Sequence, residues 1–393
     1  MKKNKYRGII VVLIFTLTTL VASSQPYIPG VSYFGRNNYI EYIAGNIPLI
    51  ISVPHGGQLT PSEIPDRVCG DETVTDSYTS ELSKELSAAI NKITGCYPHV
   101  IICNLKRSKL DANRELETAA CGNQWAEIAW NEFHQYLDIA SQKVTEESGK
   151  GLYIDLHGHG HAVQRLELGY LLTAAQLRFS DYTLNTATYK SYSSALNLIN
   201  TNISSLSHSE LLRGMNSMGT LFAIKNIPSV PSIDDPFPLS GESYFSGGYN
   251  TDRHGSRTQG TIDGIQIECN QDVRFTSTAR KDFASKAATV FLNYLTLHYF
   301  PDLADNYCNS VGVTEISNSK SQLYPNPCSN ALNVHAQMPS EIQIFNFQGI
   351  RVFSKSVSND EIIDLSQLKE GIYLVTLSIN GRPFHTEKII KKI

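Results

Sequence analysis

The segment from Gly151 to His161 constrains the fold more than any other, because an apolar stretch runs directly into an acid and three histidines. Residues 152–156 are mostly Leu, Tyr and Ile, which predicts a short buried strand. In α/β folds, ligands bind at the carboxyl ends of parallel strands, and glycine lets a ligand approach the backbone closely. The segment therefore predicts one wall of a site at a strand end. A polar turn that happens to hold histidines is the alternative.

Apolar strands alternate with amphipathic helices from residue 49 to about residue 299. Such alternation predicts a mostly parallel sheet flanked by helices, an α/β domain of the phosphorylase/hydrolase-like kind. The expected strands cover 49–53, 99–105, 152–156 and 265–269, and the expected helices cover 76–93, 123–145 and 277–297.

The N-terminus has the pattern of a secretory signal peptide. Basic residues at 2–7 precede an apolar run over 9–20, and small residues follow at 21–24. We therefore expect a signal peptide over 1–24 and a mature chain from about Gln25. No other segment is apolar enough to cross a bilayer, so no integral membrane span is expected in the mature chain.

Composition excludes some classes of partner and bounds the cysteine chemistry. The net charge is −4, the isoelectric point is about 6.3 and no basic stripe is present, so nucleic acid is not an expected partner. Seven cysteines in an exported chain permit disulfides, but the number is odd, so at least one thiol stays free or pairs between chains. Their spacings match no zinc–cysteine motif, which indicates structural roles.

The C-terminal part of the chain follows a different pattern. Residues 306–322 are rich in Ser, Asn and Thr, which is typical of a linker between a domain over 25–305 and a unit over 323–393. Short alternating runs punctuated by glycine predict that this unit is a small all-β sandwich.

This unit resembles the C-terminal sorting domain of the type IX secretion system of Bacteroidetes. The resemblance rests on Tyr324-Pro325-Asn326-Pro327, the 344–349 hairpin, the 365–374 segment and the Lys-rich last strand. It implies export to the periplasm, transfer across the outer membrane by the type IX machinery, and a secreted or cell-surface location. An accessory module that binds carbohydrate or protein is the alternative.

A second histidine also follows a strand, in the turn Pro54-His55-Gly56-Gly57. Two histidines at the ends of strands in one sheet can converge on one metal ion, and zinc takes imidazole and carboxylate ligands. The segment 70–76 supplies Asp71, Glu72 and Asp76 as candidates for the third ligand. Helix capping is the alternative role for each of these acids.

Two further segments carry substrate-binding or catalytic candidates. The 107–114 loop contains Arg and Asn side chains that could hold a carboxylate, although a solvated basic turn would look similar. Glu268 lies within an apolar strand, where a buried carboxylate needs a partner or a raised pKa, and either suits a general base. His254, in a polar loop, could reach the substrate or lie in a surface turn.

Taken in order, these motifs resemble the N-formylglutamate amidohydrolase family, which is related in fold to zinc carboxypeptidases. The resemblance implies a zinc site in which His55, Asp76 and His157 bind the metal, with His159 or His161 able to replace His157. It further implies roles for residues around the metal: Glu268 as general base, Arg107 on the oxyanion or substrate side, Asn113 and Arg114 as a clamp on a substrate carboxylate, and Asp155 and Asp111 as supports behind the ligands. His159 and His161 are expected to line the cleft, and His159 and His254 to contact substrate.

These expectations define a secreted zinc-dependent hydrolase that cleaves an amide bond in an N-acyl amino acid or a peptide with a free carboxylate. Export makes a peptide or cell-wall-derived amide a better substrate than N-formylglutamate itself. A catalytically inactive surface protein that binds peptide or glycan on the same fold is the alternative, and an adhesin or structural module is a third possibility.

Overall fold

The structure is a computed structural model of the chain. It describes residues 27–70, 72–303, 322–335, 340–346, 350–358, 360–379 and 382–392. The expected signal peptide over 1–24 and residues 306–321 of the expected linker lie outside the described residues, as does Asp71. No helix in these ranges is long and apolar enough to span a membrane.

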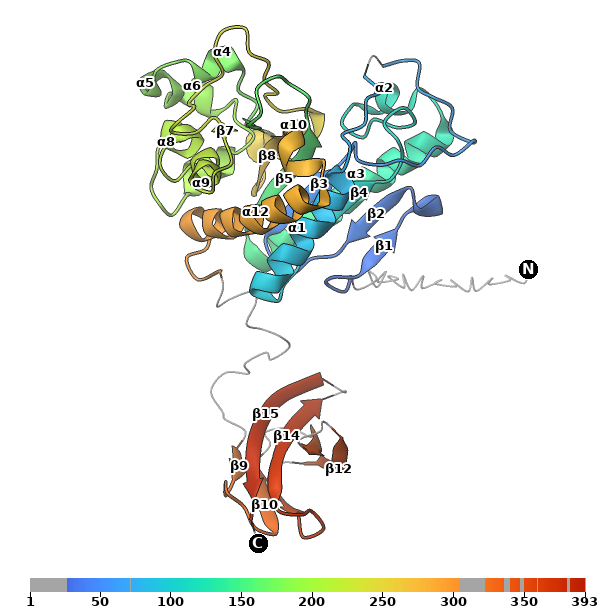
Figure 1. The fold of residues 1–393 in the computed structure, drawn as a ribbon, viewed down its shortest axis with the longest axis vertical. Coiled ribbons are helices and arrows are strands. Elements are labelled where there is room, and N and C mark those ends of the chain that lie inside the picture. Colours follow the sequence, from blue (N-terminus) through green and yellow to red (C-terminus); the bar gives the residue numbers. More distant parts are fainter. Residues whose placement is uncertain are drawn as a thin grey trace, which may run out of the picture.

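The N-terminal α/β domain is built on one mixed sheet (Figure 1). Its strands are β1 (Ser32–Phe34), β2 (Ile40–Ile43), β3 (Leu49–Val53), β4 (His99–Cys103), β5 (Gly151–Gly158), β6 (Leu166–Gly169), β7 (Ser229–Val230) and β8 (Ile262–Cys269), in the spatial order β1-β2-β4-β3-β5-β8-β6-β7. The four central strands are parallel, β4 with β3, β3 with β5 and β5 with β8. The pairs β1–β2, β2–β4 and β6–β8 are antiparallel. The predicted mostly parallel sheet is confirmed.

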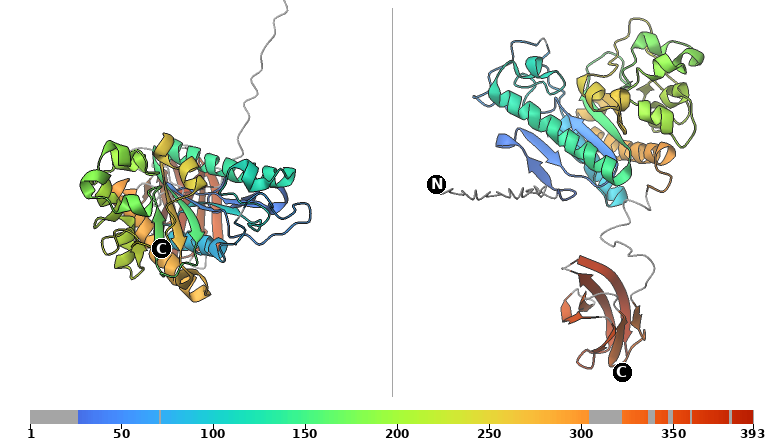
Figure 2. Two further views of the ribbon diagram at one scale, coloured as in Figure 1. Left: turned by 90° about the horizontal axis from the view of Figure 1, so that it is seen from above. Right: turned by 180° about the vertical axis from the view of Figure 1, so that it is seen from behind.

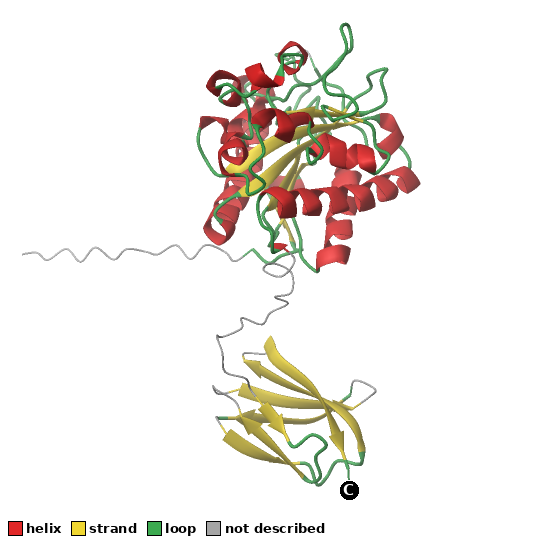
Figure 3. Ribbon diagram, turned by 90° about the vertical axis from the view of Figure 1, so that its left-hand side faces the viewer, coloured by secondary structure: helices red, strands yellow, loops and turns green. Residues whose placement is uncertain are grey.

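Helices cover both faces of this sheet (Figure 3). On one face, buried residues of α1 (Thr79–Thr94) and α12 (Ser277–His298) share one core cluster with Leu49, Ile51 and Val53 of β3, and on the other, α3 (Gln124–Ser148) shares a second cluster with Ile50. Figure 2 shows α3 crossing the sheet in the view from behind. Successive strand residues face opposite sides, so these central strands are apolar on both faces and read as continuous apolar runs.

The large helices match the sequence expectations within a few residues. α3 begins after Asn123, whose side-chain oxygen accepts hydrogen bonds from the backbone N–H groups of Trp125 and Ala126. α1 begins at Thr79, three residues later than expected, because Asp76 lies in the turn before the helix, where its backbone N–H donates to the carbonyl of His55. This turn brings Asp76 back to the end of β3.

The shorter helices and the strands β1, β2, β6 and β7 were not predicted from the sequence. The helices are α2 (Leu116–Ala120), α4 (Ala174–Leu177), α5 (Asp181–Leu184), α6 (Ala187–Lys190), α7 (Leu196–Thr201), α8 (His208–Arg213), α9 (Met218–Ile224), α10 (Tyr249–His254) and α11 (Gln271–Arg274). Helices of four to seven residues show too few turns for a helical periodicity to be recognised.

The order of the strands in the sheet determines where the candidate site lies. From β3 the chain passes to β4 on one side, and from β5 it continues through β6 and β7 to β8 on the other. Adjacent parallel strands whose connections leave in opposite directions form a crevice at their carboxyl ends. His55 follows β3 and His157 lies near the end of β5. The two histidines therefore meet at this crevice.

The C-terminal unit is a two-sheet β structure with its own core. One sheet has the order β13-β10-β9 and the other β12-β11-β14-β15, all antiparallel, and apolar residues such as Leu332, Ile344 and Val375 are buried between them. The strands are β9 (Gln322–Tyr324), β10 (Ala331–His335), β11 (Ser340–Asn346), β12 (Arg351–Val357), β13 (Asp360–Asp364), β14 (Gly371–Ile379) and β15 (Arg382–Lys391). The expected small all-β sandwich is confirmed.

Candidate metal centre

The three residues expected to bind metal lie together. The donor atoms of His55, Asp76 and His157 are all within 4.8 Å of one another, and all three residues are buried. Asp76 Oδ2 lies 3.3 Å from His55 Nδ1 and 3.1 Å from His157 Nδ1. One carboxylate oxygen and two imidazole nitrogens thus face a common point.

The far nitrogen of each histidine faces a second carboxylate. His55 Nε2 lies 2.6 Å from Asp111 Oδ1, and His157 Nε2 lies 3.1 Å from Asp155 Oδ2. Metal-binding histidines commonly donate their other ring N–H to a carboxylate, which leaves the near nitrogen as a lone-pair donor. His55 Nδ1 is buried and makes no hydrogen bond to the described residues. The donor set and this orphaned nitrogen both fit a metal ion.

Each supporting carboxylate is itself held in place. Asp155 accepts a hydrogen bond from Ser52 at 2.7 Å and another from Thr251 at 3.3 Å. Asp111 accepts from Arg107 Nε at 3.0 Å and from the backbone N–H of Asn113 at 3.0 Å. The two carboxylates therefore fix the orientation of both imidazoles before any ion binds.

Ionisation in the cluster reflects this proximity. Burial raises the pKa of Asp76, but His55 and His157 together lower it by more. The pKa of Asp76 therefore lies below the usual range for an aspartate. Burial lowers the pKa of His157, yet Asp155 and Asp76 together bring it well above 6.5. The cluster thus stabilises positive charge at its centre, which a proton or a cation can supply.

Glu268 lies beside this cluster on the neighbouring strand. It is the register partner of His157 in the β5–β8 pair, and Gln266 Nε2 donates to its Oε1 at 3.0 Å. Burial raises the pKa of Glu268 to about 8; His157 lowers it, while Asp76, Glu167 and Asp155 raise it. A carboxyl with a raised pKa next to the cluster is suited to accept a proton.

The 107–114 loop approaches from the side of α10. Asn113 is buried, its Oδ1 accepts from the backbone N–H of Asn250 at 2.8 Å, and its Nδ2 lies 3.4 Å from His157 Nε2. Arg114 is exposed, and its Nη1 donates to the carbonyl of Asn113 at 3.0 Å. Arg107 is buried and donates to Asp111 and, at 3.3 Å, to the carbonyl of Val74. Asn113 thus contacts the cluster, while the Arg114 guanidinium remains accessible.

Two expected substrate contacts have structural partners instead. His159 is buried, its Nε2 lies 2.8 Å from the carbonyl of Arg165, and its Nδ1 accepts from the backbone N–H of His161 at 3.1 Å. His254 belongs to α10 rather than to a surface turn, and it stacks on His134 with a nitrogen–nitrogen distance of 2.8 Å. Burial lowers the pKa of His254 to about 3. Their roles in substrate binding stay predictions.

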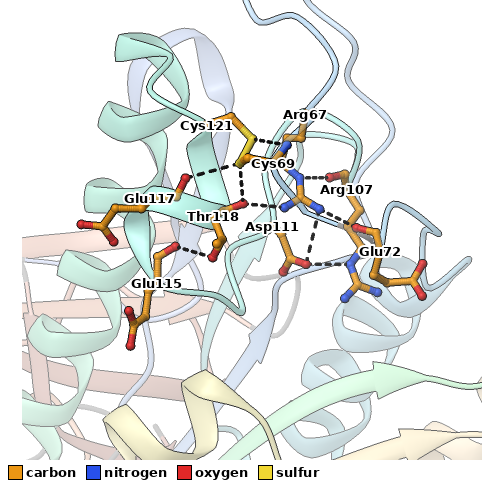
Figure 4. The surroundings of a disulfide bond; sticks show 9 residues. All are labelled: Arg67, Cys69, Glu72, Arg107, Asp111, Glu115, Glu117, Thr118 and Cys121. Atoms are coloured by element: carbon orange, nitrogen blue, oxygen red, sulfur yellow. Dashed lines mark hydrogen bonds and ion pairs between the residues drawn. A yellow bond between two sulfur atoms is a disulfide. The ribbon is translucent and has the colours of Figure 1, made fainter.

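Sequence reasoning missed Arg67, which links the site to a disulfide between Cys69 and Cys121 (Figure 4). The buried Arg67 guanidinium donates to the carbonyls of Arg107, Glu72 and Thr118 and lies 3.7 Å from Asp111 Oδ2. A lone arginine in a loop gives no sequence signal for such a role. The disulfide and Arg67 together hold the loops that carry Asp76 and Asp111.

Of the competing acids in the 70–76 segment, Glu72 does not join the cluster. Its side chain is exposed and accepts a hydrogen bond from the backbone N–H of Val74 at 2.8 Å. Among the described acids of this segment, Asp76 is the one that meets both histidines.

Replacing Asp111 with Asn is expected to weaken metal binding about 10- to 100-fold, the usual effect of removing a partner behind a metal-binding histidine. The amide cannot match the negative charge that holds His55 Nε2–H. Competition with a chelator measures the affinity. Asp66→Asn, an exposed carboxylate paired with Lys109, is the matched control and should bind metal as the wild type does. Equal affinity in Asp111→Asn would contradict the role of Asp111.

Replacing both Cys69 and Cys121 with Ser is expected to lower the free energy of unfolding by about 2–4 kcal/mol. The bond closes a loop with a sequence separation of 52 residues, so its loss restores many conformations to the unfolded chain. Denaturant unfolding measures the change, with Cys328→Ser in the C-terminal unit as the control. A decrease in the free energy of unfolding below about 0.5 kcal/mol would show that the disulfide contributes little to stability.

Comparison with known proteins gives one family match and several similar structures. Residues 322–392 match the family described as the secretion system C-terminal sorting domain, which confirms that resemblance and indicates a secreted or cell-surface protein. No curated protein sequence matches the chain.

Three solved structures resemble this chain, and each alignment covers most of the length of the solved protein. N-formylglutamate amidohydrolase from Ralstonia eutropha JMP134 is 14% identical, covers 64% of this chain and 94% of its own, and gives a TM-score of 0.38. A gene product of Agrobacterium tumefaciens is 12% identical over 66% and 95% of the two chains, with a TM-score of 0.40. A candidate metallopeptidase from Shewanella amazonensis SB2B is 12% identical over 69% and 87%, with a TM-score of 0.30. One of these structures is described as an N-formylglutamate amidohydrolase, the family that the sequence motifs resemble.

Proposed function

We propose that this protein is a secreted zinc-dependent hydrolase that cleaves an amide bond in an N-acyl amino acid or a peptide bearing a free carboxylate. One observation carries the proposal: His55, Asp76 and His157 converge with donor atoms within 4.8 Å, and Glu268 is the register partner of His157. Two imidazoles and a carboxylate that leave a position open form a typical catalytic zinc site.

The division of labour follows from the positions of the residues. Zinc, when bound, lowers the pKa of a water molecule and polarises the scissile carbonyl. Glu268 would act as the general base that takes up a proton and returns it to the leaving nitrogen, and Gln266 Nε2 donates to its Oε1 and holds the side chain in position. Asp111 and Asp155 keep the two imidazoles oriented throughout.

Substrate selection is assigned to the 107–114 loop. The exposed Arg114 guanidinium can bind a carboxylate with two parallel hydrogen bonds, and its main chain is anchored because Trp130 Nε1 donates to its carbonyl at 2.9 Å. Asn113 adds a directional polar group next to His157. Arg107 is proposed to act from the substrate side while bound to Asp111. A sorting domain at the C-terminus favours an extracellular peptide or cell-wall-derived amide.

The test is hydrolysis by the metal-free protein before and after zinc is restored, with peptides whose C-terminus is free or amidated. We expect cleavage only with zinc, and a loss of at least about tenfold in kcat/KM when the terminal carboxylate is amidated. Binding of these peptides without any hydrolysis would instead support the inactive binding protein. Cleavage that is indifferent to zinc would overturn the proposal.

A further inference from the structure

The histidine run divides between two clusters. His157 belongs to the centre described above, whereas His159 and His161 lie with Glu167 in a second group. The donor atoms of this second group also lie within 4.8 Å of one another. Glu167 is fully buried, His159 is buried, and His161 is half-buried with a side-chain exposure of 22%.

Strand pairing puts this second group beside Glu268. Glu167 on β6 is the register partner of Glu268 on β8, as His157 is on the other side. Directly opposed residues of an antiparallel pair have Cβ atoms about 5 Å apart on the same face. His157, Glu268 and Glu167 therefore form one row across three neighbouring strands, with Glu268 in the middle.

Two buried carboxyl groups side by side are stabilised by a shared proton or by nearby positive charge. Arg165, two residues before Glu167, does not supply it, because its Nη1 and Nη2 bind Asp235 at 2.7 Å and Glu242 at 2.8 Å. Within the described part of the chain, the ion pair of Glu167 is with His161, at 2.8 Å. Glu167 Oε2 accepts the backbone N–H of Phe245 at 2.7 Å, so Oε1 faces the imidazoles.

The proton position of His159 and the ring orientation of His161 are each set by a neighbouring group, as is usual for metal-binding histidines. His159 Nε2 faces the carbonyl of Arg165, which assigns the proton to that nitrogen and leaves Nδ1 as a lone-pair donor. His161 stacks on Phe245 with ring centroids 4.7 Å apart, and this contact fixes the plane of its ring. Metal binding would replace two existing contacts, His161 N–H to His159 Nδ1 and His161 Nδ1 to Glu167.

We propose that His159, His161 and Glu167 bind a second divalent metal ion, next to Glu268 and separate from the ion held by His55, Asp76 and His157. Imidazole and carboxylate donors suit zinc and neighbouring first-row ions. An ion here would neutralise the Glu167–Glu268 pair and place positive charge on the side of Glu268 opposite the first centre. The inference concerns binding, so it does not require the proposed hydrolysis.

The test counts metal ions on the full chain. The protein is stripped with a chelator, loaded with excess zinc, freed of unbound metal and analysed by atomic emission. We expect about two ions per chain for the wild type and about one each for His161→Ala, for the isosteric Glu167→Gln and for His55→Ala, which retains the second site. The double variant His55→Ala/His161→Ala should bind no ion. This result would also show that the cysteines do not bind zinc in this assay. Gln164→Ala, an exposed neighbour on the same loop, should bind about two.

The outcomes separate this inference from the proposed function. One ion per chain in the wild type, unchanged in His161→Ala and Glu167→Gln, would overturn the second site and leave the proposed hydrolase intact. No bound ion in the wild type would overturn both. Titration with cobalt(II) supplies a second readout, because the second equivalent should produce absorption bands that are missing in Glu167→Gln even if His161→Ala does not fold.

Discussion

Glu268→Gln is expected to lower kcat for amide hydrolysis about 10²- to 10⁴-fold, the usual contribution of a positioned general base. Gln has nearly the same shape as Glu but cannot accept the proton of a metal-activated water. The metal ligands are untouched, so zinc content and KM should stay close to those of the wild type. Steady-state kinetics with a chromogenic peptide amide, beside metal analysis of the same samples, measures both.

The matched control is Gln266→Ala. Gln266 holds Glu268 Oε1 but has no proton to exchange, so its loss should cost far less than the loss of Glu268. Undiminished hydrolysis in Glu268→Gln would refute the assignment of the base. Equal losses in the two variants would show that shape, rather than proton transfer, is what matters at this position.

His55→Ala is expected to abolish hydrolysis and to weaken metal binding at the first centre by more than the roughly 10- to 100-fold typical of a lost partner behind a ligand. The substitution removes one of three protein donors from a buried site and leaves the Asp111 carboxylate without its imidazole. Metal titration followed by activity assays at saturating zinc measures both effects.

His99→Ala provides a control of the same residue type. His99 is buried, but its Nδ1 is paired with Tyr42 at the amino end of β4, away from the crevice. Its loss should destabilise the fold without changing the metal affinity of the folded protein. Full activity in His55→Ala at saturating zinc would remove His55 from the site.

The first centre could be predicted from the sequence because the ends of buried strands can be recognised there. Each apolar run that ends in His or Asp places that side chain at one edge of the parallel sheet, so His55 and His157 could be expected to meet. Asp76 could be named only as one of three acids, since the choice depends on a turn before α1 that carries no local signal. The structure brings Asp76 to the histidines and leaves Glu72 in solvent.

Within the second group of donors, His159 and His161 were candidates from the sequence, but Glu167 could not be predicted. Glu167 lies in β6, a strand of four residues with a charged centre, and such a run reads as a loop. Its proximity to Glu268 follows from an antiparallel pairing across 100 residues of chain that no local pattern encodes. Arg67 was missed for the same reason, because its partners come from three separate segments of the chain.

The most direct test of the central claim is a crystal structure of the zinc-loaded protein with anomalous diffraction at the zinc edge. We expect a peak about 2.0–2.2 Å from His55 Nδ1, His157 Nδ1 and an oxygen of Asp76, with Glu268 on its open side. A zinc-loaded protein whose map has no peak between these three residues would contradict the account.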